Sequence, residues 1–138
     1  MGTQQLLLVV LGVIVVGAAV AIAIFIFGTN ADQATKDALT QDCLHLVSSA
    51  QGYFSKPSML GGANNSFTGL RISDCGMRDN GEGAGENLNG TFSILKADGL
   101  SLTVQAVSAS NPARTVTLTL DMTRNEAEER IEILYDGW

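Results

Sequence analysis

The chain has 138 residues, of which 46% are hydrophobic, and its formal net charge is -6 at pH 7. All 8 Lys and Arg residues and all 14 Asp and Glu residues lie at or beyond Asp32, so the negative charge belongs to a polar portion of about 110 residues, the size of one domain. This acidic balance argues against nucleic acid and anionic lipid headgroups as partners, because both select clustered Lys and Arg.

The start of the chain is apolar on every side. Residues 6–27 form an unbroken run without a charged, strongly polar or proline side chain. As a helix this run is about 33 Å long, which is enough to cross a hydrocarbon layer of roughly 30 Å. A helix that is hydrophobic all round must be surrounded by lipid or by other apolar helices. We therefore predict that residues 1–28 form a transmembrane or filament-core helix.

Three interpretations of this helix stay open: a cleaved signal peptide, a permanent membrane anchor, and a helix that leaves the membrane to pack against copies of itself. Residues 1–5 contain no basic side chain, which disfavours a secretory signal. The small residues Gly12, Gly17 and Ala21 would let neighbouring helices approach closely. The alternative is that Gly and Ala are simply common in membrane spans.

Residues 30–54 have the period of an amphipathic helix. The sequence Gly28-Thr29-Asn30 separates this helix from the apolar run, and whether it breaks or only kinks the chain stays open. Apolar residues at spacings of three and four form one face: Leu39, Cys43, Leu46, Ala50 and Phe54. The opposite face is polar, so we expect the apolar face to pack against another layer of structure.

The two cysteines are expected to pair. Cys43 lies on the apolar face of the second helix, and Cys75 follows 32 residues later. Two cysteines in a chain with an exported acidic domain predict a disulfide, which would contribute roughly 3 to 4 kcal/mol in the chain-entropy model. The alternative is two free, buried thiols.

Residues 55–90 are predicted to form a long connection between the second helix and the sheet. They hold 8 of the 15 glycines and show no sustained period. A connection of this length in a compact domain is usually functional or disordered unless it is pinned. We expect Cys75 to pin it and residues 70–72 to add a short strand.

Two features of this connection suggest ligands or modification. Asp79, Glu82 and Glu86 are weak Ca²⁺ candidates, because carboxylates on a flexible backbone suit this ion, although the EF-hand spacing is missed and a solvated loop is the default. Asn64 and Asn89 each begin an Asn-x-Ser/Thr triplet and are candidate glycosylation sites.

Residues 91–138 change to a period of two and predict a four-stranded antiparallel meander. Asp98-Gly99 marks the first hairpin turn. In the clearest strand, apolar residues alternate with a threonine face: Val116, Leu118 and Leu120 against Thr115, Thr117 and Thr119. The last strand, residues 130–135, places Ile131, Ile133 and Tyr135 on one face. We therefore predict an α+β fold, in which residues 29–138 form a head with the second helix packed on the sheet.

No catalytic or cofactor motif accompanies this fold. The chain has no Walker, Rossmann or zinc spacing. The only histidine, His45, is set in a predicted helix, which leaves no Ser-His-Asp or Cys-His arrangement. We therefore expect that the protein is not an enzyme and carries no cofactor.

This order of elements resembles a mature type IV pilin or a pilin-like (pseudopilin) subunit. The resemblance rests on a short uncharged start, an apolar helix, an amphipathic continuation and a small antiparallel sheet. It implies that a prepilin peptidase cuts before the apolar run and that the new first residue, here Met1, is N-methylated. The family has Glu at the fifth position, thought to meet the N-terminal amine of a neighbour, whereas this chain has Gln5, which can accept a hydrogen bond but cannot form that ion pair.

The resemblance implies a structural subunit of an extracellular helical filament of identical copies. Before assembly, such a subunit sits in the cytoplasmic membrane and is handled by dedicated assembly machinery. Two alternatives stay open: a pseudopilin of a secretion system, and a single-pass membrane-anchored binding domain whose ligand site is the loop 79–87. Whether a filament would serve adhesion, motility, DNA uptake or secretion is also open.

Overall fold

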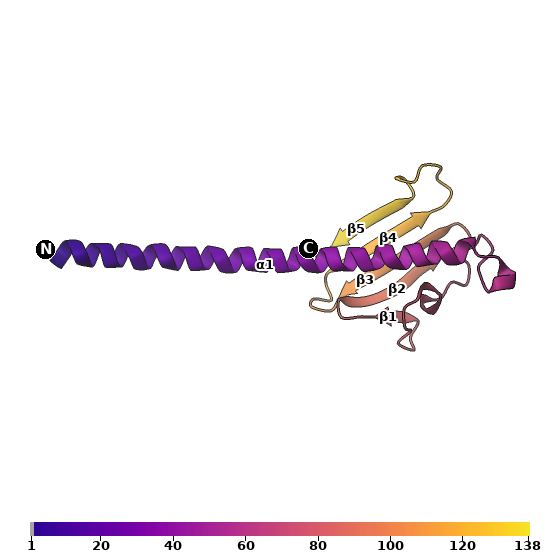
Figure 1. Cartoon of the computed structure of the whole chain (residues 1–138), viewed down its shortest axis with the longest axis horizontal. Coiled ribbons are helices and arrows are strands. Elements are labelled where there is room, and N and C mark those ends of the chain that lie inside the picture. Colours follow the sequence, from indigo (N-terminus) through magenta and orange to yellow (C-terminus); the bar gives the residue numbers. More distant parts are fainter. Residues whose placement is uncertain (1) are drawn as a thin grey trace. The chain divides into compact units, whose positions relative to one another are not determined.

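The computed structural model describes residues 2–138, so Met1, with its predicted methylation and assembly contact, lies outside the described residues. One long helix, α1 (Gly2–Ser55), is followed by a sheet of short strands (Figure 1). The chain divides into two compact units, one ending at Ala34 and one covering Thr35–Trp138. The question left open at residues 28–30 is answered by α1, which runs through them without a break, and Thr29 Oγ1 donates to the Ile26 carbonyl within the helix at 2.9 Å.

The sheet has five strands, each antiparallel to its neighbour, in the order β1-β2-β3-β4-β5. The strands are β1 (Ala84–Glu86), β2 (Gly90–Ala97), β3 (Ser101–Ser108), β4 (Thr115–Asp121) and β5 (Ile131–Asp136). The predicted meander of four strands is confirmed as β2 to β5. The prediction missed β1, a three-residue strand within the glycine-rich connection.

The core of the second unit lies between α1 and one face of the sheet. The apolar face predicted for the helix is confirmed, with Val47 added: Leu39, Cys43, Leu46, Val47, Ala50 and Phe54 are buried. The sheet contributes Phe92, Leu102, Val104, Ala106, Val116, Leu118 and Leu120. On β3 and β4 these residues alternate with partly exposed ones, which are polar except for Val107, as the period of two predicts.

The strand β5 forms one edge of the sheet and is largely exposed. Its register places Ile131, Ile133 and Tyr135 opposite Leu120, Leu118 and Val116, which confirms that the three share the inner face. Ile131 is nevertheless 37% and Tyr135 39% exposed. Tyr135 is held against α1, because Lys36 Nζ lies 4.0 Å from its ring centroid and Thr40 Oγ1 donates to its hydroxyl at 3.3 Å.

The segment after α1 folds back over the end of the helix. Backbone N–H groups of Ala63 and Asn65 donate to the carbonyls of Tyr53 and Phe54 in the last turn of the helix, and the Tyr53 carbonyl also accepts from the Lys56 N–H at 3.3 Å. Two short 3₁₀ helices follow, η1 (Ser58–Leu60) and η2 (Ile72–Cys75). The strand expected at residues 70–72 is therefore wrong: Leu70, Ile72 and Cys75 instead pin the connection by burying their side chains in the core.

Trp138 packs within its own chain, beside the first residue of β4. Trp138 Nε1 donates to the Thr115 carbonyl at 3.0 Å, and the guanidinium of Arg114 lies 5.3 Å from the indole ring. The ring packs against the core. Because Trp138 is the only tryptophan, its fluorescence reports on the folding of the second unit.

Candidate functional site

The apolar part of α1 is the most extensive exposed feature of the described residues. Within residues 2–138, no side chain of α1 before Leu39 is buried. The sixteen large apolar side chains from Leu6 to Phe27 are each between 49% and 80% exposed. By length and composition this helix can cross a membrane, its most apolar 18-residue window having a mean hydropathy of 3.1.

Removing this apolar surface from water would contribute a large favourable free energy. Removing a large apolar side chain from water stabilises by at least about 1.5 kcal/mol, so sixteen such side chains represent roughly 25 kcal/mol. A helix with this surface on all sides cannot remain in water and requires lipid or other apolar helices around it. The segment is therefore a candidate assembly or membrane surface.

The predicted close-packing residues lie on this surface and have no role inside their own chain. A Cβ atom added at Gly12 or Gly17 would meet no atom within 4 Å. Ala21 and Gln5 are likewise exposed on α1. Any constraint on the size of these residues must therefore come from lipid or from another molecule.

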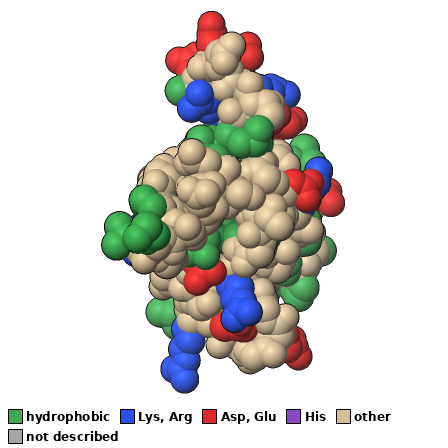
Figure 2. Space-filling model, turned by 90° about the vertical axis from the view of Figure 1, so that its right-hand side faces the viewer, with side chains coloured by type: hydrophobic (Ala, Val, Ile, Leu, Met, Phe, Trp, Pro, Cys, Tyr) green, Lys and Arg blue, Asp and Glu red, His purple; other side chains and the backbone are tan. Residues whose placement is uncertain are grey.

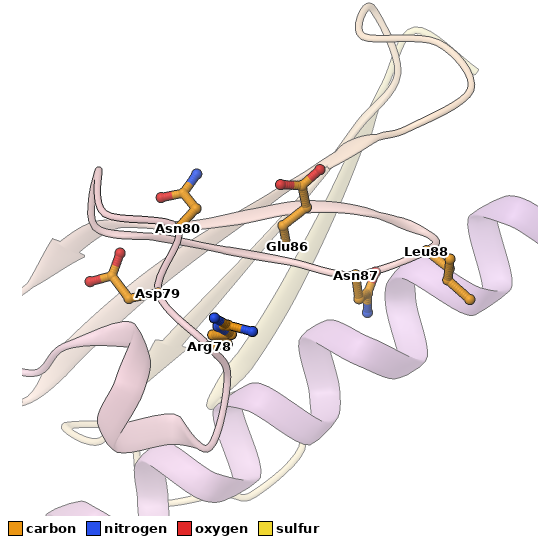
Figure 3. A pocket seen from close by; sticks show the side chains of 6 residues that line it. All are labelled: Arg78, Asp79, Asn80, Glu86, Asn87 and Leu88. Atoms are coloured by element: carbon orange, nitrogen blue, oxygen red, sulfur yellow. The ribbon is translucent and has the colours of Figure 1, made fainter.

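A second candidate site is an open hollow of about 630 Å³ beside β1. Its lining consists of Arg78, Asp79, Asn80, Glu86, Asn87 and Leu88 (Figure 3). This hollow is lined by both ends of the loop 79–87 that the sequence suggested as a ligand site, residues 79–80 and 86–87, but not by its middle. Its size is that of a small-molecule site, but most of its side chains are exposed, whereas such sites usually enclose their ligand.

One end of the hollow is fixed to α1 by a carboxylate, which we call the Asp42 clasp. Asp42 Oδ2 accepts hydrogen bonds from Asn87 Nδ2 at 2.9 Å and Asn89 Nδ2 at 2.7 Å. Asn87 Oδ1 in turn accepts from the backbone N–H groups of Asn89 and Gly90. The turn between β1 and β2 is therefore tied to the helix through three part-buried polar side chains. Sequence reasoning missed this clasp because Asp42 lies on the face that its spacing predicts to be solvated.

The Ca²⁺ candidates are not brought together. Among residues 2–138 there is no group of three or more His, Cys, Asp or Glu side chains placed to hold a metal ion. Asp79 Oδ1 instead accepts hydrogen bonds from the N–H groups of Gly81 and Gly83, which shape the loop. Glu82 and Glu86 are exposed on the same loop. Asp79 Oδ1 is therefore already occupied by two hydrogen bonds from the backbone of its own loop.

The two cysteines are both part of the core. Cys43 and Cys75 are free thiols in the structure, and each is buried. Burial, reinforced by the neighbouring Asp42, raises the pKa of the Cys43 thiol to about 12. Burial with Asp74 nearby raises the pKa of Cys75 to about 11. The structure holds no bridge between them, and the disulfide stays a prediction.

The two glycosylation candidates differ in their surroundings. Asn64 is exposed and has a positive φ of 52° in the segment that closes the end of α1. Asn89 is half-buried, and its side-chain nitrogen, the atom that would carry a sugar, donates to Asp42 at 2.7 Å. Of the two, only Asn64 presents its side chain without breaking the Asp42 clasp.

The head also exposes charges of both signs and single apolar side chains, among them Met59 and Leu88. On the face shown in Figure 2, acidic and basic side chains are interspersed at the top of the view, and hydrophobic side chains form small separate groups. His45 is exposed on α1, as its helical position predicts. Comparison of the chain with protein-family models, curated proteins and solved structures finds no match.

Proposed function

We propose that this protein is a structural subunit of an extracellular, type IV pilus-like filament that assembles through its apolar N-terminal helix. The observation that carries the proposal is the exposed apolar segment of α1, continuous with a helix that is buried in a folded head. Copies of this segment packed side by side would satisfy its need for apolar cover, and the heads would then lie on the outside.

The details of α1 support assembly over a simple anchor. An anchor in lipid gains little from glycine, which weakens a helix by about 1 kcal/mol relative to Ala. Gly12 and Gly17 have open space around them in the single chain, so a neighbouring backbone could approach there. In such a core Gln5 would hydrogen-bond to the amine or backbone of the next copy, in place of the ion pair that Glu makes in pilins.

The proposal includes processing and partners. Before assembly the chain sits in the cytoplasmic membrane, where a prepilin peptidase exposes Met1 for N-methylation and an assembly machinery extracts the subunit. The finished filament is a helical array of identical copies and needs no cofactor, catalytic site or nucleic acid. A pseudopilin of a secretion system would use the same surfaces.

Electron microscopy and mass spectrometry together test this function. Filaments are sheared from cells that produce the full chain, imaged in negative stain, and labelled with an antibody against the head. The N-terminal peptide of the same fraction is then weighed. The proposal expects labelled filaments whose subunit begins at a methylated Met1. An unmodified protein that is released only by detergent, with no labelled filament, would refute it.

A second candidate function rests on the hollow beside β1. If the chain stays a single-pass membrane protein, this open hollow of about 630 Å³ is a candidate site for a small ligand outside the membrane. Arg78 and Glu86 supply charges of both signs. In that case detergent-solubilised protein would be monomeric, and Arg78→Ala would abolish ligand binding without affecting membrane insertion.

A further inference from the structure

The chain contains two Asn-Gly sequences, Asn80-Gly81 and Asn89-Gly90, and they meet different surroundings. An asparagine followed by glycine can lose ammonia when the glycine nitrogen attacks the side-chain carbon Cγ, because glycine has no side chain to shield that nitrogen or restrict its backbone. The reaction needs a base for the glycine N–H and donors for the oxygen that becomes negative. The surroundings therefore decide which of the two reacts.

At Asn80-Gly81 a carboxylate and two backbone N–H donors lie at hydrogen-bond distance from the reacting groups. Asp79 Oδ1 accepts the hydrogen bond of the Gly81 N–H at 2.8 Å, within the range for proton transfer to a positioned carboxylate. Asn80 Oδ1 accepts from the backbone N–H of Glu82 at 2.9 Å and of Ala84 at 3.4 Å. These two donors point at the atom on which negative charge develops, which is the arrangement of an oxyanion hole.

We propose that Asn80 is a site of spontaneous, intramolecular deamidation, with Asp79 as the base and the N–H groups of Glu82 and Ala84 as oxyanion donors. The Gly81 nitrogen forms a bond to Asn80 Cγ, its proton passes to Asp79, and the carbonyl electron pair moves to Asn80 Oδ1. The pair then returns, the Cγ–Nδ2 bond breaks, and Nδ2 leaves as ammonia with the proton from Asp79. Water opens the cyclic imide, giving Asp or isoaspartate at position 80.

Asn89-Gly90 has the same two residues without this arrangement. Asn89 Nδ2, the leaving group, donates to Asp42 Oδ2 at 2.7 Å. The Gly90 N–H donates to an amide oxygen, Asn87 Oδ1, at 3.1 Å, and an amide is a far weaker base than a carboxylate. Gly90 is also buried, and a Cβ atom there would lie 2.1 Å from the Val107 carbonyl oxygen. Asn89 is therefore an internal control in the same protein.

The reaction would change the character of the exposed loop. A new carboxylate next to Asp79 takes the formal net charge from -6 to -7. Figure 3 shows Asp79 and Asn80 at the end of the hollow away from Asn87. An isoaspartate adds one atom to the main chain between Asn80 and Gly81, and so would displace the backbone N–H groups that now bond to Asp79 and Asn80.

The test follows the two asparagines by mass spectrometry in the full chain in detergent. Protein is incubated at pH 8 and 37 °C, and a protease that cuts after glutamate separates the two sites, since Glu82 and Glu86 lie between them. We expect Asn80 to gain the mass of an amide-to-acid change at least about tenfold faster than Asn89. In Asp79→Ser, whose hydroxyl can still accept the backbone N–H bonds, the rate at Asn80 should fall at least about tenfold.

The direction in which Asp79→Ser changes the deamidation rate at Asn80 decides whether Asp79 promotes the reaction or protects against it. If the hydrogen bonds to position 79 only hold the loop and the Asp79 carboxylate is not the base, Asp79→Ser will deamidate at Asn80 as fast as the unaltered protein or faster, and the inference is overturned. Equal rates at Asn80 and Asn89 in the unaltered protein overturn it without any variant. Asp42→Ala provides a further check, because freeing Asn89 should raise the rate at Asn89 and leave that at Asn80 unchanged. Trp138 fluorescence verifies that each variant is folded.

Discussion

Replacement of Asp42 by Ala tests how strongly the Asp42 clasp holds the β1–β2 turn to α1. The substitution removes two hydrogen bonds from part-buried amides to one carboxylate, at 2.9 and 2.7 Å. A hydrogen bond to a charged group contributes about 1.5 to 3 kcal/mol, but Asn87 and Asn89 would regain water, so we expect a net loss of roughly 2 kcal/mol in the free energy of unfolding. For a unit of about 100 residues this corresponds to a Tm lower by roughly 10 °C.

The assay is thermal unfolding of the full chain in detergent, followed by the fluorescence of Trp138. Asp42→Asn should give an intermediate Tm, because its amide oxygen can still accept one hydrogen bond. Lys96→Gln is the matched control, since it breaks the 2.9 Å ion pair with Asp98 in which both side chains are about 60% exposed. Exposed ion pairs contribute little, so its Tm should not change. If Asp42→Ala melts within 2 °C of the unaltered protein, the clasp does not stabilise the fold.

Four further predictions address assembly, the thiols (two predictions) and the core. Gly17→Leu should prevent filament formation without lowering the Tm of the head, because the new leucine side chain would meet only a neighbouring molecule. The control variant Val15→Leu should still assemble. Normal filaments of Gly17→Leu in electron microscopy would contradict the close-packing argument. Protein recovered from outside the cell should incorporate no alkyl group when denatured without reductant, as the predicted bridge between Cys43 and Cys75 requires. After reduction, the raised pKa values of Cys43 (about 12) and Cys75 (about 11) mean that the folded protein favours the neutral thiols. The free energy of unfolding should therefore keep its full value below pH 9 and fall as the pH rises through 11. An unchanged free energy of unfolding from pH 8 to 11 would show that the thiols are not buried. Phe92→Ala, at a fully buried position on β2, should lower the free energy of unfolding by about 3 to 5 kcal/mol in urea titrations, and a loss below 1 kcal/mol would mean that α1 is not packed there.

The long periodic elements could be predicted from sequence because each has a repeated physical signal. The spacing of Leu39, Cys43, Leu46, Ala50 and Phe54 specifies one helix face, and the alternation from Val116 to Leu120 specifies a strand with one face buried. Both patterns extend over enough residues to exceed chance, and both are confirmed.

The glycine-rich connection could not be predicted in the same way, because its structure depends on contacts with distant residues. The strand β1 has three residues, one of them Gly85, which is too short for any period to appear. It forms because β2 lies beside it and because Asp79 bridges to Gly85. Similarly, residues 70–72 carry apolar side chains that suggested a strand, but burial of Ile72 and Cys75 in a 3₁₀ turn satisfies them.

The candidate sites also differ in whether the sequence could predict them. The apolar segment of α1 was evident from composition, since its exposure follows from the absence of any polar face. The Asp42 clasp was not, because its three side chains come from positions 42, 87 and 89, and no local pattern relates them. The burial of both cysteines was partly evident: the helical period places Cys43 inside, whereas nothing near Cys75 indicates its direction.

The way α1 is held in the head has a mechanical consequence. Its six buried side chains, from Leu39 to Phe54, are spread over 16 residues, or about 24 Å of helix. A load along the helix axis must therefore shear all six contacts at the same moment, whereas a sideways pull at one end would peel them away one turn at a time. Tension applied along α1 therefore acts on the head in the direction in which its packing resists best.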